Sequence, residues 1–440
     1  MRISLVVTVA TLVASRDLLR AQTVSVMAQA IPVVTRAEPT ATRTTLTEGY
    51  LSQPAVMAHG SAQWFQVRAT LNLEGLTLQR GELSTGGYGE GYVDRRHPHA
   101  YAHEFLGGAE VERWGFRGSV FAGRGFAPFG SDDPMSRPFE KFPVNHHLAQ
   151  ILERVVAIAA VRRGPVIGEF GTFNGDEPTG PSASPEFGRF GDSWSARLTI
   201  LPFPGAEVSG SFANVTSPEM RLAHGLDQRK TSAVARLSQQ SASSWRYALV
   251  EFAHTQERNG SEVATSLSSI LGEGAYCKKG AVLAGRFERT ERPEEEQLLD
   301  PFRTPRPGTD FGNLGISHWT SLTVSLSAPA ARISIGLARP FLEVARVAVA
   351  RGSPAGVFNP ELRYGATRMW MISGGMRLRV GAMHDRMGRY GVALPDMKMT
   401  QHGTPPASGE SVVMPEMTHP MNAAGAASMT GHGASSQCTL

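Results

Sequence analysis

Apolar and polar side chains alternate residue by residue in several long segments of this chain. The clearest segment is 321–327, where Leu322, Val324 and Leu326 are separated by serine and threonine. The same alternation is present at 65–74, 195–200, 207–212 and 376–380. Because successive side chains of a β-strand point to opposite faces, this period predicts strands with one apolar and one polar face.

Less regular strands are predicted in eight further segments. These are 101–113, 115–124, 164–173, 231–240, 244–256, 279–290, 331–338 and 341–350. The abundance of glycine, with 47 residues, favours a chain with many turns over a helical bundle. Together these segments predict an all-β protein of about 12 to 16 strands.

Composition separates the patterned body, 61–394, from three other regions. Residues 1–30 read as an export signal, because an apolar stretch follows Arg2 and Ala28-Gln29-Ala30 offers a small-x-small cleavage site. Residues 31–60 are predicted to be a linker. Residues 395–440 are predicted to be a disordered tail rich in Met and His, because they contain no aromatic residue with which to build a core.

An exported chain of this kind has one route across a membrane. Beyond the amino-terminal stretch, the longest uncharged apolar run, 155–161, is far shorter than a membrane-spanning helix. A membrane-inserted form must therefore be a closed antiparallel β-barrel, with the polar strand faces lining the lumen. The predicted lumen residues are Arg68, Arg197, Glu207 and Arg377. A soluble β-sandwich, whose polar faces would point outward, fits the same alternation.

Charge and cysteine content narrow the function classes. The 43 basic and 39 acidic residues are spread along the chain, whereas nucleic-acid binding needs a concentrated basic patch. Cys277 and Cys438 have neither the dense spacing of a disulfide scaffold nor that of a zinc ribbon. We expect two free or incidentally paired thiols, with a structural disulfide as the alternative.

One stretch departs from the strand pattern. Asn145 can cap a helix through residues 146–160, where apolar residues recur at helical spacing. A loop folded into the lumen and a long irregular strand are the alternatives.

Histidines gather in two segments. His97, His99 and His103 precede Glu104, and in an extended chain the three imidazoles share one strand face. The segment 130–154 adds a second group of candidate ligands, which are Asp132, Asp133, His146, His147 and Glu153. Imidazole with carboxylate is a ligand set for a transition metal. A hydrogen-bonded polar cluster at a barrel rim is the alternative for the first segment, and ordinary turn chemistry for the second.

The tail carries six of the sixteen methionines. A segment without packing demands has little use for Met, so clustered thioethers and imidazoles indicate a flexible copper(I) ligand set. The candidate ligands are Met414, Met417, His419 and Met421. Compositional drift is the alternative.

The segments DRRHPHAYAHE (94–104), APFGSDDPMSRPFEKFPVNHHLAQILER (127–154) and FNGDEP (173–178) carry a resemblance. They are similar to a family of uncharacterised bacterial outer-membrane barrel proteins that share a His-Pro-His block, a His-His segment and an Asn-Gly loop. The resemblance covers roughly 60–390 and implies a porin-like shell linked to metal handling. By position, the matching residues are His97, Pro98, His99, His146, His147, Asn174 and Gly175.

The chain is therefore expected to be a non-enzymatic outer-membrane channel or solute-binding barrel, with copper as the one candidate cofactor. The expected partners are outer-membrane lipid and lipopolysaccharide, small solutes or metal ions, and the barrel-assembly machinery, with no nucleic acid. The alternatives are a soluble periplasmic β-sandwich binding module and a structural or adhesive outer-membrane shell.

Overall fold

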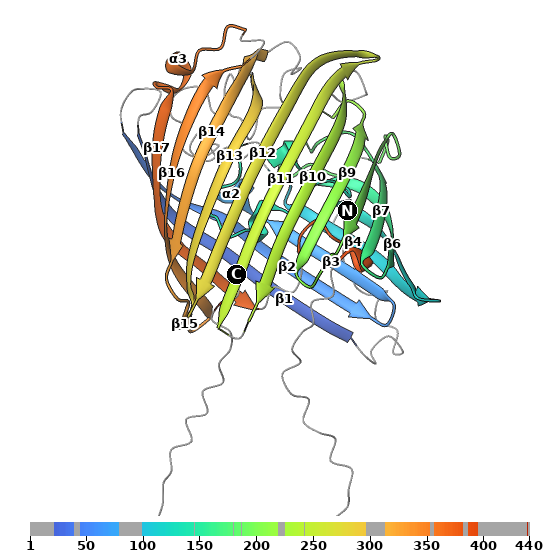
Figure 1. Cartoon of the computed structure of the whole chain (residues 1–440). Helices are drawn as coiled ribbons and strands as arrows, with labels where there is room; N and C mark the ends of the chain where they lie inside the picture. The colour runs from blue at the N-terminus through green and yellow to red at the C-terminus, as the bar shows by residue number, and fades with distance from the viewer. Residues whose placement is uncertain are drawn as a thin grey trace, which may run out of the picture.

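In the computed structural model, the described residues build one all-β body (Figure 1). They are 22–38, 45–78, 99–144, 146–178, 180–185, 187–218, 225–241, 243–295, 313–352, 356–381, 386–394 and 438. The strands are β1 (Gln22–Glu38), β2 (Leu46–Ala62), β3 (Phe65–Asn72), β4 (Ala102–Arg113), β5 (Phe116–Gly125), β6 (Arg154–Arg163), β7 (Val166–Phe173), β8 (Ser193–Ile200), β9 (Ala206–Val215), β10 (Asp227–Gln240), β11 (Ser244–Asn259), β12 (Glu262–Lys278), β13 (Ala281–Glu295), β14 (Asn313–Ser327), β15 (Ala331–Ile333), β16 (Gly336–Arg351) and β17 (Arg368–Gly381).

The strands form one 17-stranded antiparallel sheet that closes on itself. Apart from the step from β14 to β15, each strand pairs with the next in sequence, and β1 pairs with both β2 and β17. Because β14 pairs directly with β16, the three-residue β15 is a side extension, and the other sixteen strands close the ring. The predicted fold class, an antiparallel barrel of 12 to 16 strands, is confirmed.

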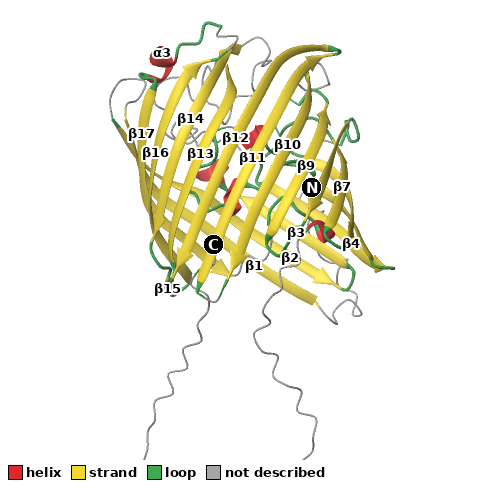
Figure 2. Cartoon of the chain, viewed as in Figure 1, coloured by secondary structure: helices red, strands yellow, loops and turns green. Residues whose placement is uncertain are grey.

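Short helices lie in the connections between strands and after the last strand (Figure 2). They are α2 (Glu74–Thr77), η1 (Pro134–Ser136), η2 (His146–Leu148), α3 (Pro360–Tyr364) and η5 (Gly391–Ala393). None of the helices in the described part of the chain has the length and hydropathy needed to cross a membrane.

The two ends of the barrel differ. Two-residue turns such as 63–64, 114–115 and 164–165 lie at one end, and the start of β1 and the end of β17 lie there too. The longer connections lie at the other end, which carries α3 (Figure 1). Outer-membrane barrels have short periplasmic turns and long extracellular loops, so the short-turn end corresponds to the periplasmic side.

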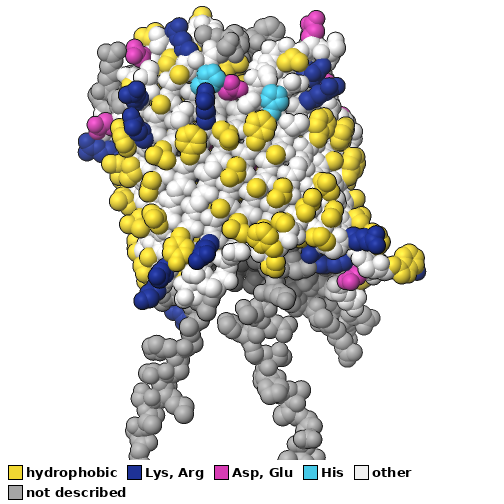
Figure 3. Space-filling model, in the orientation of Figure 1, with side chains coloured by type: hydrophobic (Ala, Val, Ile, Leu, Met, Phe, Trp, Pro, Cys, Tyr) yellow, Lys and Arg dark blue, Asp and Glu magenta, His cyan; other side chains and the backbone are white. Residues whose placement is uncertain are grey.

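The two faces of the sheet have opposite polarity. On β14, Leu322 is 54% exposed on the outside, whereas Ser321 is 5% exposed and faces inward. Apolar side chains form a belt around the visible face, with Lys and Arg above and below it (Figure 3). This is the polarity of a barrel in lipid and the reverse of a soluble sandwich, so the sandwich alternative is wrong. The barrel is built for the outer membrane.

Exposed tryptophans lie near both rims of the belt. Trp64 and Trp114 occupy short turns, and Trp194 and Trp370 point outward near the longer connections. The other two tryptophans are buried. Aromatic girdles of this kind anchor a barrel at the membrane interfaces.

The barrel begins earlier in the chain than predicted. β1 and β2 occupy residues 22–62, so the prediction of a linker over 31–60 is wrong, and the body does not begin at residue 61. The inward residues Ile31 and Val33 of β1 are apolar and pack with Phe341, which removes the alternation that reveals a strand. Since β1 also overlaps the predicted signal, 1–30, cleavage after Ala30 would cut a strand that closes the ring.

The helix predicted at 146–160 is also wrong. The structure has the single turn η2 there, followed by β6. The inward side chains of β6 include Val156 and Ile158, which pack into an apolar cluster rather than facing water. Apolar residues on both faces of a strand mimic helical spacing. The alternative of a loop folded into the lumen is the one that the structure has.

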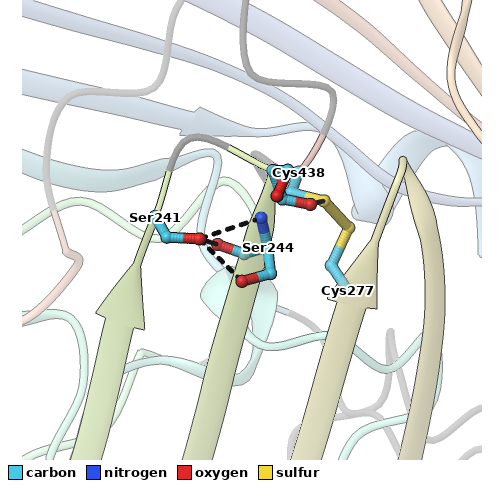
Figure 4. The surroundings of a disulfide bond; sticks show 5 residues. Ser241, Ser244, Cys277 and Cys438 are labelled. Atoms are coloured by element: carbon cyan, nitrogen blue, oxygen red, sulfur yellow. Dashed lines mark hydrogen bonds between the residues drawn. A yellow bond between two sulfur atoms is a disulfide. The ribbon is translucent and has the colours of Figure 1, made fainter.

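The two cysteines form a disulfide, so they are not free thiols, and the pairing that the sequence left open is made. Cys277, at the short-turn end of β12, is bonded to Cys438, and their Cα atoms are 5.7 Å apart (Figure 4). The bond lies beside the turn that joins Ser241 and Ser244, and Cys438 contacts the carbonyl oxygen of Ser243. The chain end is thereby tied to the short-turn mouth of the barrel.

Candidate functional site

The lumen is occupied by residues 126–153, here called the inner loop, which connect β5 and β6. Nearly every described residue of the inner loop is buried. Its two ends are joined by the hydrogen bond from Ala127 N to Ile151 O, at 3.0 Å. Gly130 has a φ of +64°. An added Cβ there would lie 1.7 Å from the carbonyl oxygen of Ala149, so only glycine fits this turn.

Carboxylates of the barrel wall hold the inner loop across the lumen. The Glu343 carboxylate, on β16, accepts the backbone N–H groups of Glu140 and Lys141 at 3.1 and 3.2 Å. Glu288, on β13, accepts from Val144 N at 2.6 Å. Since β13 and β16 are remote from β5 and β6 in the ring, the inner loop crosses the lumen.

Arginines complete this attachment. Arg137, in the inner loop, lies 3.4 Å from both Glu251 and Glu273 on the neighbouring strands β11 and β12. Arg286, on β13, donates to Glu273 at 2.7 Å and to the carbonyl oxygen of Lys141 at 2.6 Å. Each of these side chains is buried and charge-paired, which is the condition under which buried ions are tolerated.

A second segment enters the lumen after β17. Residues 386–394, here called the inner segment, include η5, which packs against β4, β5, β6 and β7. The Tyr390 hydroxyl donates to Glu104 at 2.7 Å and accepts from Phe126 N at 3.0 Å. Val392 N donates to Ser119 Oγ at 3.3 Å. The inner segment thus binds both the wall and the inner loop.

Arginine and carboxylate pairs fix the inner segment. Arg386 donates two hydrogen bonds to Asp132, at 2.5 and 2.6 Å, and pairs with Glu207. Arg389 donates to Glu169 at 3.3 Å. Burial alone would raise the pKa of the Asp132 carboxyl, but Arg386 and Arg236 outweigh it and hold the pKa well below its usual range. Asp132 is therefore a carboxylate, and it links the two lumen segments.

The predicted lumen residues lie on the inner face of the barrel. Arg68, Arg197 and Glu207 are buried there, and Arg377 is half-buried on β17. They are engaged rather than free. Arg197 donates to both oxygens of Glu169 at 2.6 Å, and the Arg68 guanidinium lies 5.9 Å from the Tyr390 ring centroid.

The structure brings together four of the predicted histidines. The His99 ring centroid lies 5.1 Å from that of His103, 5.8 Å from His146 and 6.5 Å from His147. His99 lies just before β4 and His103 lies at its start, whereas His146 and His147 belong to η2 in the inner loop. His97 and the tail candidates Met414, Met417, His419 and Met421 lie outside the described residues.

Glu153, the last residue of the inner loop, connects the histidines. Its Oε1 lies 2.6 Å from His103 Nδ1 and 3.2 Å from His99 Nδ1. Both carboxylate oxygens also accept from Ala100 N, at 2.9 and 3.0 Å. The other ring nitrogen of His103 lies 3.4 Å from Asp133 Oδ2. Burial would raise the pKa of the Glu153 carboxyl, but the imidazoles of His99 and His103 lower it overall.

Sequence reasoning missed the inner segment as a functional element. The signal is the charged and aromatic composition of Arg386, Arg389 and Tyr390 between the last strand and the low-complexity tail. It also missed the wall carboxylates Glu288 and Glu343. No sequence signal marks them, because their partners are backbone N–H groups of a distant loop.

Comparisons with known proteins give only distant likenesses. No protein-family model matches the sequence, and no curated protein matches it. The anion-selective porin from Comamonas acidovorans is similar at a TM-score of 0.47 and 9% identity, over 82% of this chain and 100% of that one. The trimer form of OmpT, an outer membrane protein of Vibrio cholerae, is similar at 0.46 and 10%, over 81% and 100%. Pseudomonas aeruginosa OccK2 in complex with glucuronate is similar at 0.37 and 8%, over 82% and 98%.

Proposed function

We propose that this chain is a porin-like channel for small polar solutes, narrowed from within by the inner loop and the inner segment. The observation that carries the proposal is the closed ring of sixteen strands with an apolar outer face and a polar inner face. Barrels of this strand number enclose a lumen wide enough for water, whereas eight strands are filled by their own side chains. Transport or solute binding, rather than catalysis, is the function that this form serves.

The lining favours polar and charged solutes. The inner loop and the inner segment place Asp132, Arg137 and Arg386 in the lumen, where wall residues of opposite charge balance them. A passage between such groups excludes apolar molecules, because they cannot replace the hydrogen bonds of the water that they displace. The apolar belt would contact lipid, and the basic residues above and below it would meet lipid and lipopolysaccharide headgroups.

Liposome swelling tests the channel. Vesicles that contain the refolded full chain should swell in isotonic arabinose and fail to swell in isotonic stachyose, because the filled lumen admits the smaller sugar only. Vesicles with heat-denatured protein are the control. Heat-modifiable gel migration shows whether the barrel is folded. If the folded barrel lets no solute cause swelling, the channel is absent and the structural or adhesive shell is the better account.

Copper handling by the tail is a second candidate, favoured by its Met and His content. We expect the combined substitution of Met414, Met417 and Met421 by alanine to weaken copper(I) binding at least about tenfold, because thioethers are weak ligands that act together. Competition titration against a copper(I) chelator measures this. The substitution keeps Cys438 and its disulfide, which a truncation would remove. Met376→Leu, on the outer face, is the matched control. Equal affinities in all three proteins would remove the tail from copper binding.

A further inference from the structure

We propose that His99, His103 and Glu153 form a binding site for one transition-metal ion, Zn(II) or Cu(II), inside the barrel. The channel proposal makes no use of these residues, so this inference goes beyond it. One ring nitrogen of His99, one of His103 and a carboxylate oxygen of Glu153 lie within 4.8 Å of one another, and all three side chains are buried.

The spacing of these atoms fits a metal centre. Zinc lies about 2.0 to 2.2 Å from imidazole nitrogen and carboxylate oxygen, so its ligands in a tetrahedral site are about 3.3 to 3.6 Å apart. Glu153 Oε1 lies 3.2 Å from His99 Nδ1 and 2.6 Å from His103 Nδ1. An outward shift of the His103 ring by less than 1 Å, roughly, would admit the ion.

The backbone supports a specific role for Glu153. Its φ of +59° lies in the left-handed region, which glycine adopts freely and which costs other residues roughly 1 to 2 kcal/mol. Ala100 N donates to both oxygens of the carboxylate and holds it in place. Glu153 keeps this costly conformation while its carboxylate is held against His99 and His103, which is where a ligand of the ion must lie.

The surroundings resemble the second sphere of metal sites. A metal-bound histidine usually directs its other ring nitrogen to a carboxylate, which fixes the ring and its tautomer. His103 does so with Asp133, at 3.4 Å. Asp133 is itself fixed, because its Oδ1 accepts from Met135 N at 2.7 Å. The rings of His146 and His147 lie next to this group, with centroids 5.8 and 6.5 Å from that of His99.

The donor set selects the ion. Two nitrogens and one carboxylate oxygen suit Zn(II) and Cu(II), whereas Ca(II) and Mg(II) require oxygen ligands and Cu(I) prefers sulfur. Bound there, the ion would join the start of β4 to the end of the inner loop and so strengthen the closed arrangement of the lumen. The alternative is a metal-free ion pair, in which a protonated His103 lies between Glu153 and Asp133.

Metal titration distinguishes the two. The full chain, with the tail residues His402, His419 and His432 changed to alanine, is stripped with EDTA and titrated with Zn(II) against a competing chelator. We expect one tightly bound Zn(II) per chain. Glu153→Gln and His103→Asn should each weaken binding at least about 100-fold, since even groups that only orient a ligand cost 10- to 100-fold. His254→Ala, on β11, is the matched control, because His254 contacts Ser268 outside the cluster.

Two measurements keep the test decisive. Heat-modifiable migration shows whether each variant is folded. The Cu(II) electron paramagnetic resonance spectrum of the protein with the native site identifies the ligand atoms directly. Hyperfine coupling to at least two imidazole nitrogens, lost in Glu153→Gln or His103→Asn, supports the site. Absence of stoichiometric binding, or binding unchanged in both folded variants, overturns it and leaves the ion pair.

Discussion

Replacing Arg197 with methionine should lower the free energy of unfolding by about 3 kcal/mol, because it leaves a buried carboxylate without its main partner. Arg197 and Glu169 are both buried and share two hydrogen bonds of 2.6 Å. We expect this loss of stability to lie near the lower end of the range for broken buried pairs, because Arg389 still donates to Glu169 at 3.3 Å. Urea unfolding of the barrel in phospholipid vesicles, followed by tryptophan fluorescence, measures it.

An exposed pair provides the control. Arg36 and Glu38 lie 3.4 Å apart with most of both side chains exposed, so Arg36→Met should cost less than about 1 kcal/mol. The double variant Glu169→Gln/Arg197→Met should recover part of the loss, because it removes the uncompensated charge. An Arg197→Met cost no larger than that of Arg36→Met would mean that the lumen is wet around this pair. Charge reversal at Arg197 would then change ion selectivity instead.

Reversing two charges in the inner segment should drive it out of the lumen. In the native protein, Arg386 and Arg389 pair with Asp132, Glu207 and Glu169. In the variant Arg386→Glu/Arg389→Glu, the two new carboxylates would face these same three carboxylates. Like charges at such distances in a buried site repel by several kcal/mol, roughly, and each 1.4 kcal/mol changes the exposed population about tenfold.

A reporter cysteine measures this release. In a Cys277→Ser/Cys438→Ser background, Val392→Cys is buried in the native arrangement and should react with a hydrophilic maleimide at least about tenfold faster after the charge reversal. Ser261→Cys, in an exposed turn, should react equally fast with and without the reversal. Equal rates at position 392 would show that Arg386 and Arg389 do not hold the inner segment.

The sequence predicts a strand correctly wherever one face of that strand contacts lipid and the other faces the polar lumen. Residues 321–327 are such a case, and their predicted polarity is that of the structure. The pattern disappeared where a strand's inner face is covered by protein. Val156 and Ile158 of β6 face the inner loop, and Ile31 and Val33 of β1 face Phe341. The errors at 146–160 and 31–60 follow from this, because apolar residues on both faces carry no period of two.

The histidine cluster was predictable in its residue types and not in its geometry. Sequence places His99 and His103 on one strand face, and the repeated histidines at 146 and 147 in a separate segment. Their meeting depends on the infolding of the inner loop and on the left-handed backbone of Glu153, which no local pattern signals. The disulfide could be stated only as an alternative, since Cys438 reaches Cys277 across 161 residues of sequence and no local pattern pairs them.

The proposed function requires that the lumen conducts and that the inner segment narrows it. Single-channel conductance in planar bilayers, recorded side by side for the native chain and for Arg386→Glu/Arg389→Glu, tests both points at once. We expect a small, stable conductance for the native chain and one at least about twice as large for the variant, because a sixteen-stranded ring without the inner segment leaves a wider aqueous path. Equal conductances would contradict the role of the inner segment, and the absence of conductance in both folded proteins would contradict the channel itself.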